Sequence, residues 1–290
     1  MKQIVYLNGK FLPLGKARVS ALDRGFLFGD AVYEVIPSYE GRLFRLHHHL
    51  ERLEQSLSAI RMTNPLAAEQ WQDLLRTLIE RNPGIDQAVY LQVTRGAPDK
   101  RDHAIPRDLA PTLFAMSAPL PPRAPYIAER GIAAITLDDI RWRHCHIKST
   151  NLLPNVLLRQ EALDNEAEEA ILLRAGEVTE GAATNLFLVR SGEILTPPKD
   201  ELVLPGITRD LILELAADAD LPYAERTILD RELETADEIW LTSSMREVVP
   251  VTRLNSRPVG NGRPGPIWQR MSELFQAYKE RLRVQAASGA

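Results

Sequence analysis

Residues 141–153 read RWRHCHIKSTNLL, a cationic stretch that contains no acidic residue. Trp142, His144, His146 and Lys148 alternate in it, so an extended backbone would place these four side chains on one face. An aromatic ring and two imidazoles would partly remove the lysine amine from water. Because burial and neighbouring positive charge both favour the neutral amine, which attacks carbonyl carbons, Lys148 is suited to forming a Schiff base with an aldehyde. The alternative is an ordinary surface lysine.

The bulk composition around this stretch is that of a globular protein. Of 290 residues, 44% are hydrophobic and 26% are charged, and the formal net charge is -4 at pH 7. The length favours two domains over one. Interspersed charges of both signs give no reason to expect nucleic-acid binding. Apolar runs too short to cross a bilayer, and an N-terminus unlike a signal peptide, predict a cytoplasmic protein without a membrane segment.

Cysteine and histidine usage predicts neither disulfides nor a metal site. The single cysteine, Cys145, rules out an internal disulfide framework, and no CxxC pair is present to bind zinc. The run at residues 47–49, HHH, falls at the start of a predicted helix, where successive side chains diverge too far to bind one ion. Cys145 can be either a reactive thiol or a small buried residue, and the roles of His144 and His146 stay open.

Periodicity and turn residues predict strands and helices on both sides of a proline-rich segment at 119–125. Before it we expect hairpins at 4–11 and 31–46, helices at 47–62 and 66–81, and strands at 88–94 and 112–117. After it we expect strands at 131–137, 170–173, 185–189 and 238–242, and helices at 151–165, 208–219 and 266–283. The prediction is an α+β protein with a first domain at 1–118, a linker at 119–126 and a strand-rich second domain at 127–290.

Five collinear motifs connect these elements to a known family. In chain order they are DRGFLFGDAVYE at 23–34, IKSTNLL at 147–153, VTEG at 178–181, LPGITR at 204–209 and LTSS at 241–244. Together the motifs resemble those of the fold-type IV aminotransferases, which use pyridoxal 5′-phosphate. The resemblance covers nearly the whole chain, from Tyr6 to about Tyr278. It implies a smaller N-terminal α/β domain and a larger, strand-rich C-terminal pseudo-barrel domain that binds the cofactor.

The resemblance also implies which residues hold that cofactor. Lys148 matches the lysine that bonds covalently to it, and Glu180 matches the glutamate that faces the pyridine nitrogen and keeps it protonated. Thr208 is predicted to cap a helix whose first N–H groups suit a phosphate. The remaining matches for the phosphate and the ring are Arg52, Leu204, Gly206, Ile207, Ser243 and Ser244. Taken singly, Glu180 could be a solvated turn acid, Leu204 a core residue and Thr208 only a cap.

A basic loop suggests how the substrate is recognised. Arg101 and His103 are two positions apart, so an extended loop points both side chains the same way, and a guanidinium beside an imidazole can bind a carboxylate. This pattern resembles the one that binds the substrate α-carboxylate in D-amino-acid aminotransferases, with Tyr33 assisting. The alternative is a solvated loop in which Asp99 and Asp102 neutralise the two bases. In the family this loop reaches the neighbouring subunit's site, so a homodimer is implied.

The resulting hypothesis is transamination between a D-amino acid such as D-alanine and a 2-oxo acid such as 2-oxoglutarate, which gives pyruvate and D-glutamate. Alternatives are a branched-chain or (R)-amine aminotransferase of the same fold, or a non-catalytic small-molecule-binding dimer. The chain departs from D-amino-acid aminotransferases at residues 182–184, AAT, where hydroxyl residues are common, and at Met245 and Arg246. These departures bear on the substrate range and on hydrogen bonds near the cofactor.

Overall fold

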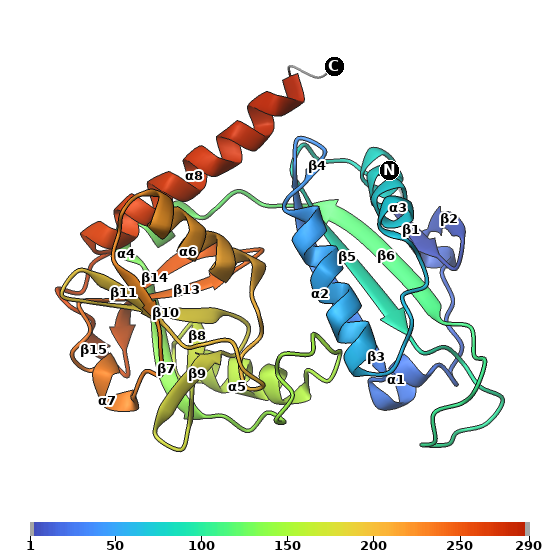
Figure 1. The fold of residues 1–290 in the computed structure, drawn as a ribbon, viewed down its shortest axis with the longest axis horizontal. Coiled ribbons are helices and arrows are strands. Elements are labelled where there is room, and N and C mark those ends of the chain that lie inside the picture. The colour runs from blue at the N-terminus through green and yellow to red at the C-terminus, as the bar shows by residue number, and fades with distance from the viewer. Residues whose placement is uncertain (1–2, 288–290) are drawn as a thin grey trace. The chain divides into compact units, whose positions relative to one another are not determined.

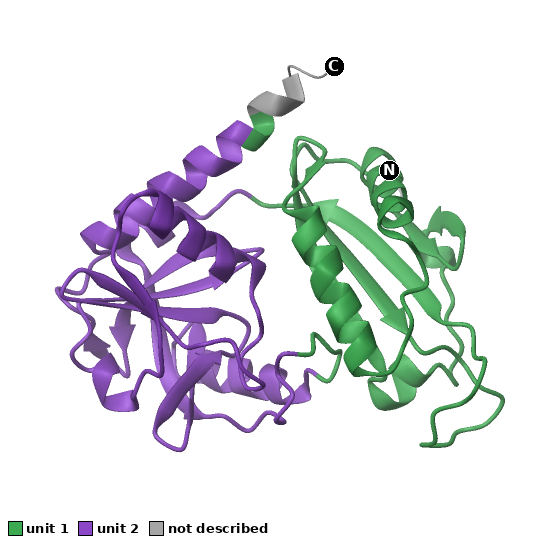
Figure 2. Cartoon of the chain, in the orientation of Figure 1, with its two compact units in different colours: residues 1–121, 147–151, 282–290 green, residues 122–146, 152–281 purple. Residues whose placement is uncertain are grey.

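The computed structural model describes residues 3–287, with side chains described as far as Arg283. The chain divides into two compact units, coloured separately in Figure 2. Of the described residues, unit 1 holds 3–121, 147–151 and 282–287, and unit 2 holds 122–146 and 152–281. The first boundary falls within the predicted linker. The chain returns to unit 1 for residues 147–151 and then re-enters unit 2, so the segment around Lys148 belongs to the first unit and both of its flanks to the second.

Unit 1 is built on one antiparallel sheet of six strands in the order β2-β1-β6-β5-β3-β4. Both predicted hairpins are confirmed: Asn8 and Gly9 turn one, Glu40 and Gly41 turn the other, and all four residues have positive φ. The strands are β1 (Ile4–Leu7), β2 (Lys10–Pro13), β3 (Ala31–Tyr39), β4 (Arg42–Leu43), β5 (Gln87–Thr94) and β6 (Thr112–Pro119).

Two amphipathic helices, α2 (Leu46–Ala59) and α3 (Ala68–Glu80), pack on this sheet (Figure 1). Leu53 and Leu57 of α2 are fully buried and belong to the same hydrophobic core as alternate strand residues such as Val89 and Leu91. The apolar face of the helix thus packs on the apolar face of the sheet. The short elements η1 (Leu14–Lys16) and α1 (Arg24–Phe28) complete the unit.

Unit 2 contains a nine-stranded mixed sheet in the order β12-β11-β10-β13-β14-β7-β8-β9, with β15 paired to β14. The pairs β14–β7, β7–β8 and β11–β12 are parallel and the others antiparallel. Strands and helices in both units confirm the predicted α+β class. The strands are β7 (Ile132–Asp138), β8 (Glu169–Arg174), β9 (Glu177–Gly181), β10 (Asn185–Arg190), β11 (Glu193–Thr196), β12 (Tyr223–Glu225), β13 (Glu238–Ser243), β14 (Glu247–Leu254) and β15 (Arg257–Pro258).

Five helices accompany this sheet (Figure 1): α4 (Pro125–Arg130), α5 (Leu153–Asp164), α6 (Ile207–Asp218), α7 (Asp230–Leu233) and α8 (Pro266–Ala287). The main core is aliphatic and includes Leu186 and Leu188 of β10 and Ile239 and Leu241 of β13. Among the described residues, no helix combines the length and apolar character needed to cross a bilayer.

The expectation of an extended backbone from Trp142 to Lys148 is wrong. The stretch consists of bends and turns because its N–H groups find separate acceptors in place of one partner strand. The Cys145 N–H donates to the carbonyl oxygen of Glu201 at 2.7 Å, and the Lys148 N–H donates to Ser56 Oγ at 3.2 Å. His144 contacts the rings of Trp142 and His146, but these three residues lie in unit 2 and Lys148 in unit 1.

Candidate active site

The Lys148 segment is fixed to β3 by backbone hydrogen bonds. The Tyr33 N–H donates to the carbonyl oxygen of Lys148 at 3.0 Å, and the Thr150 N–H donates to that of Ala31 at 3.1 Å. With the bond from the Lys148 N–H to Ser56 of α2, this segment has partners in both a strand and a helix of unit 1. The position of Lys148 is therefore set by the core of unit 1.

The Lys148 amine lies over an aromatic ring. Its Nζ is 4.3 Å from the centroid of the Tyr33 ring, which stacks on Tyr90 at 5.7 Å. Two residues predicted for one site, Lys148 and Tyr33, thus meet in the structure.

Arg52 is held by a buried carboxylate. Its Nε and Nη2 donate to the two oxygens of Glu34, both at 2.8 Å, and His49 Nδ1 lies 2.7 Å from Glu34 Oε2. Burial alone would raise the pKa of Glu34, but Arg52 and His49 lower it far below its usual value. Because this fork-to-fork contact fixes the plane of the guanidinium, Glu34 orients Arg52. Sequence reasoning passed over Glu34, although it lies in the 23–34 motif.

Histidines 47 and 49 contact different carboxylates. His49 is fully buried beside Glu34, and burial lowers its pKa. His47 is exposed and lies 3.1 Å from Glu51, one helical turn further along α2. The two side chains therefore have different partners on different sides of the helix.

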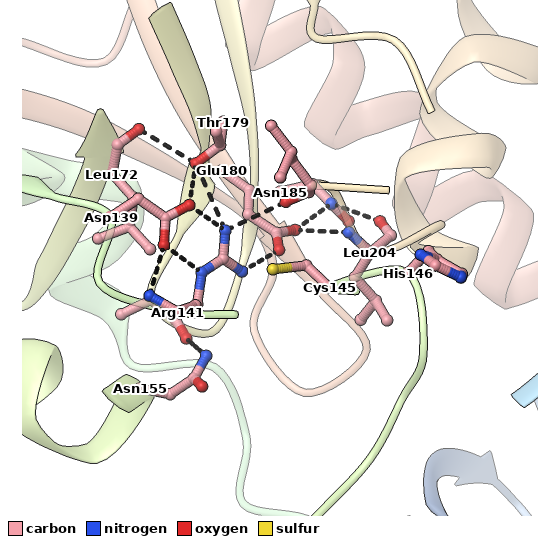
Figure 3. A network of polar contacts seen from close by, with 12 residues as sticks. Asp139, Arg141, Cys145, His146, Asn155, Leu172, Thr179, Glu180, Asn185 and Leu204 are labelled. Carbon is pink, nitrogen blue, oxygen red and sulfur yellow. Dashed lines mark hydrogen bonds and ion pairs between the residues drawn. The ribbon is translucent and has the colours of Figure 1, made fainter. Parts of the chain in front are cut away.

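In unit 2 a buried polar network surrounds Glu180, at the end of β9 (Figure 3). Arg141 Nη1 donates to Glu180 Oε1, while the Asn185 side-chain amide and the Leu204 N–H donate to Oε2 at 3.0 and 3.1 Å. Burial raises the pKa of Glu180 to about 7, and Arg141 and the Leu204 N–H offset part of that rise. Glu180 is thus a buried, hydrogen-bonded carboxyl group with a raised pKa, and it is not the solvated turn acid of the alternative.

Arg141 is itself fixed by Asp139, as Figure 3 shows. Its Nε and Nη2 donate to the two oxygens of Asp139, both at 2.9 Å, and Thr179 Oγ1 donates to Asp139 at 3.0 Å. Burial alone would lower the pKa of Arg141, but Asp139 and Glu180 raise it well above its usual value. Sequence reasoning missed both Asp139 and Arg141. The signal in the sequence was Asp139, an acid two residues before Arg141, the arginine with which the cationic stretch begins.

The start of α6 lies close to the same network. Gly206 is the N-cap residue, and a Cβ there would lie only 1.9 Å from Asn185 Oδ1, so glycine allows Asn185 to approach. The prediction that Thr208 caps this helix is wrong: helix geometry begins at Ile207, and no side chain makes the capping bond. The first N–H groups of a helix, here those of Ile207, Thr208 and Arg209, have no partner within the helix.

Ser243 and Ser244 lie where β13 ends and turns into β14. Both are partly exposed, and Ser243 Oγ accepts a hydrogen bond from the Arg246 N–H at 3.2 Å. Arg246 also lies 3.6 Å from both Glu168 and Glu169. The basic side chain that departs from the family pattern is thus paired with acids of unit 2.

Arg101 and His103 lie in an exposed loop of unit 1, between β5 and β6. Among the described residues, no ion pair joins either of them to Asp99 or Asp102, and Asp102 pairs with Lys100 at 3.8 Å. No hydrogen bond or ring contact in the described structure joins them to Tyr33. The predicted substrate residues therefore form two groups in one chain: Tyr33 contacts Lys148, and in the described structure the Arg-x-His pair makes no hydrogen bond, ion pair or ring contact with either.

The chain thus combines an antiparallel sheet in unit 1, a mixed sheet in unit 2 and a lysine segment of unit 1 flanked on both sides by unit 2, a fold shared with solved aminotransferases. The branched-chain amino acid aminotransferase of Escherichia coli has this fold, with a TM-score of 0.89 and 26% identity over 96% of this chain and 94% of that one. The family model for amino-transferase class IV matches residues 31–254, and the chain belongs to this family. The predicted family and enzyme class are confirmed.

Relatives that match over nearly their whole length have a more specific name, D-alanine aminotransferase. The chain is 38% identical to the D-alanine aminotransferase of Staphylococcus haemolyticus over 95% of this chain and 98% of that one. It is 39% identical to the D-alanine aminotransferase of Bacillus licheniformis, over 94% and 95% of the two chains. Among solved structures, the branched-chain aminotransferase of Thermoproteus uzoniensis with norvaline matches with a TM-score of 0.85 and 27% identity, over 95% and 94% of the two chains.

Proposed function

We propose that this class IV aminotransferase exchanges an amino group between a D-amino acid such as D-alanine and a 2-oxo acid such as 2-oxoglutarate, and so produces pyruvate and D-glutamate. The observation that carries this proposal is the near-complete coverage, at 38% and 39% identity, of relatives named D-alanine aminotransferase. The Arg101-x-His103 pair supports it, because no acid of its own loop, which the structure describes in full, neutralises it in an ion pair.

The proposed cofactor is pyridoxal 5′-phosphate, and the donor set of the chain fits it. Glu180 offers a buried carboxylate oxygen to a protonated pyridine nitrogen, and Leu204 an apolar side chain to the ring. The N–H groups of Ile207 and Thr208 suit a phosphate, because they lie at the positive end of α6. Arg52 and the hydroxyls of Ser243 and Ser244 would complete the phosphate contacts.

When bound, this cofactor supplies an aldehyde that receives the amino group and a ring that withdraws electrons from the substrate Cα. Lys148 would hold the cofactor covalently at rest and, once released, would take the proton from the substrate Cα and later return one, as general base and general acid. Glu180, paired with Arg141, would keep the ring nitrogen protonated.

Substrate handedness would follow from how the carboxylate is held. Arg101 and His103 would bind the two carboxylate oxygens with help from Tyr33, and the Cα–H bond of a D-amino acid would then face Lys148. An L-amino acid held by the same contacts would present its side chain to the lysine instead. The stereochemical preference is therefore a consequence of the carboxylate contacts.

The protein would work as a homodimer. In the described part of one chain, no polar or ring contact joins Tyr33 to Arg101 or His103, so the basic loop could serve a second copy of the chain. Helix α5 adds support, because Leu153, Val156 and Leu157 are exposed on it and are 69%, 59% and 54% accessible. The cytoplasmic location expected from the sequence stays a prediction.

Initial rates with 2-oxoglutarate as acceptor test the proposed function. We expect D-alanine to react much faster than L-leucine or (R)-1-phenylethylamine, with D-glutamate as the product on chiral chromatography. L-leucine represents the second candidate, which the similarity to solved branched-chain aminotransferases favours. Faster turnover of L-leucine, or L-glutamate as the product, would exclude the D-amino-acid assignment.

A further inference from the structure

The two basic side chains of the substrate loop share one aromatic partner. The Arg101 guanidinium carbon lies 4.8 Å from the centroid of the Phe28 ring, and the His103 ring lies 5.0 Å from it, tilted by 36°. Phe28 is the last residue of α1 and is only partly exposed, whereas Arg101 and His103 are exposed. A guanidinium over an aromatic face is attracted by the negative potential of the ring, so Phe28 restricts where both bases can go.

The backbone of the same loop is held by the first residue of α1. Arg24 Nη1 donates to the carbonyl oxygens of Asp102 and Ala104 at 2.5 and 3.3 Å, and Nη2 donates to that of His103 at 3.3 Å. Arg24 is buried, and its Nε donates to Asp30 at 2.7 Å, which fixes the guanidinium in place. One buried side chain therefore binds three successive carbonyl groups at the turn that carries the Arg-x-His pair.

Helix α1 is also attached to both ends of the loop. Asp23, its N-cap, accepts hydrogen bonds from Thr94 Oγ1 at the end of β5 and from Thr112 Oγ1 at the start of β6, at 3.0 and 2.7 Å. The Arg24 N–H donates to the carbonyl oxygen of Gly96 at 2.9 Å. The same short helix thus contacts the base of the loop through Asp23 and its outer part through Arg24 and Phe28.

We propose that Phe28 and Arg24 are positioning residues for substrate recognition: they hold the Arg101 and His103 side chains in the geometry that binds the substrate carboxylate. This inference rests on the proposed function of Arg101 and His103. An exposed loop without regular structure would otherwise lose side-chain freedom when substrate binds, and contacts made in advance remove that cost from binding. Loss of these contacts therefore weakens substrate binding and leaves the chemical step largely unchanged.

The test compares Phe28→Leu with Phe11→Leu in the holoenzyme. Phe11 is a matched control, because Arg81 lies 4.4 Å from its ring in the same unit, away from the substrate loop. We expect Phe28→Leu to raise KM for D-alanine by about fivefold, within the range expected for a cation–π contact, and to change kcat by less than about twofold. Phe28→Tyr keeps the aromatic face and should restore the wild-type KM. An unchanged KM in Phe28→Leu would overturn the proposal.

Arg101→Ala separates this proposal from the function on which it rests. If Arg101→Ala leaves KM unchanged, the carboxylate role of Arg101 is wrong. If Arg101→Ala raises KM but Phe28→Leu does not, only the positioning role is wrong. In the Arg101→Ala background the effect of Phe28→Leu should shrink, since one of the three partners of the Phe28 ring, Arg24, Arg101 and His103, is gone. An undiminished effect would mean that Phe28 acts elsewhere.

A second measurement does not depend on activity. Arg24→Lys keeps a positive charge near Asp30 but cannot reach three carbonyl groups. We expect faster amide hydrogen exchange at residues 101–105 in this variant than in the wild type, with exchange in α3 unchanged. Equal exchange in the loop would show that Arg24 does not hold it.

Discussion

The pair formed by Glu180 and Arg141 is the most informative contact at the scale of single residues. Both side chains are buried, and Asp139 binds Arg141 through two further hydrogen bonds. Removing one member of a buried, hydrogen-bonded ion pair typically costs about 3–5 kcal/mol, because the other charge is left unpaired. Arg141 therefore tunes and orients the one carboxyl group that the proposed chemistry needs beside the ring nitrogen.

The raised pKa of Glu180 predicts a pH-dependent stability. A carboxyl group whose pKa rises from 4.5 to about 7 on folding contributes stability below about pH 4.5, and this is lost as the pH rises through 7. In cofactor-free protein, the unfolding free energy of the wild type should fall relative to Glu180→Gln across this range, by up to roughly 3 kcal/mol. Loss of the contact between Glu180 and Arg141 adds an offset that is the same at every pH in the range, because Arg141 stays charged and keeps its hydrogen bonds to Asp139. Unfolding free energies of the two proteins are obtained from thermal unfolding at each pH. If their plots against pH run parallel, the prediction is contradicted.

At the scale of elements, α2 and β3 fix the lysine segment. Ser56 is buried on α2 and accepts from the Lys148 N–H, while Ser58 is exposed on the same helix. Ser56→Ala leaves that N–H without its acceptor, which costs about 1–3 kcal/mol when the group is buried, and shifts the amine. We expect kcat for D-alanine to fall about threefold to tenfold in Ser56→Ala, because the amine is misplaced. Ser58→Ala is the control. An equal fall in kcat in Ser58→Ala would show that the hydrogen bond between Ser56 and the Lys148 N–H does not matter for activity.

Elements with a clear local signal could be predicted from the sequence. Asn8-Gly9 marks its hairpin, and the leucines of α2 mark its buried face. Strand β14 was missed because Pro250 counts against a strand, although β14 lies between β13 and β7 in the sheet. Its place depends in part on pairing with β7, which lies more than a hundred residues earlier in the chain, and local patterns do not record such pairing.

The candidate site also divides into residues that the sequence predicts and partners that it does not. The five motifs predict Lys148 and Glu180 as site residues, because residue type and spacing carry the family resemblance. The contact between Arg141 and Glu180 joins residues 39 positions apart, and the contacts of Phe28 join α1 to a distant loop. Such partners follow from tertiary packing. For the same reason the alternation from Trp142 to Lys148 was misleading, since the acceptors of its N–H groups lie in other segments.

At the scale of the whole molecule, α5 has apolar residues on two opposite sides. Leu158 and Ala162 pack into unit 2, while Leu153, Val156 and Leu157 are exposed on the other side of the helix. An exposed cluster of large apolar side chains at helical spacing marks a surface that another molecule covers. A second copy of the chain is the occupant that the proposed function requires.

This surface predicts the effect of a charge on assembly. Leu157→Glu should convert a dimer into monomers, with loss of most transaminase activity, because a buried unpaired carboxylate opposes association. Asp73→Lys, at an exposed position of α3 in unit 1, should leave assembly unchanged. Light scattering coupled to size-exclusion chromatography gives the mass of each variant. A Leu157→Glu protein that stays dimeric and active would place the interface elsewhere.

The central claim is that the amine of Lys148 carries the chemistry, and chemical trapping tests it most directly. Borohydride reduction of the holoenzyme fixes the cofactor to the lysine that holds it, and peptide mapping by mass spectrometry then locates the modified residue. In holoenzyme that has not been exposed to D-alanine, we expect the adduct on Lys148. Once D-alanine has converted the cofactor to its aminated form, we expect no adduct. An adduct on another lysine, or one that persists unchanged after D-alanine, would contradict the account.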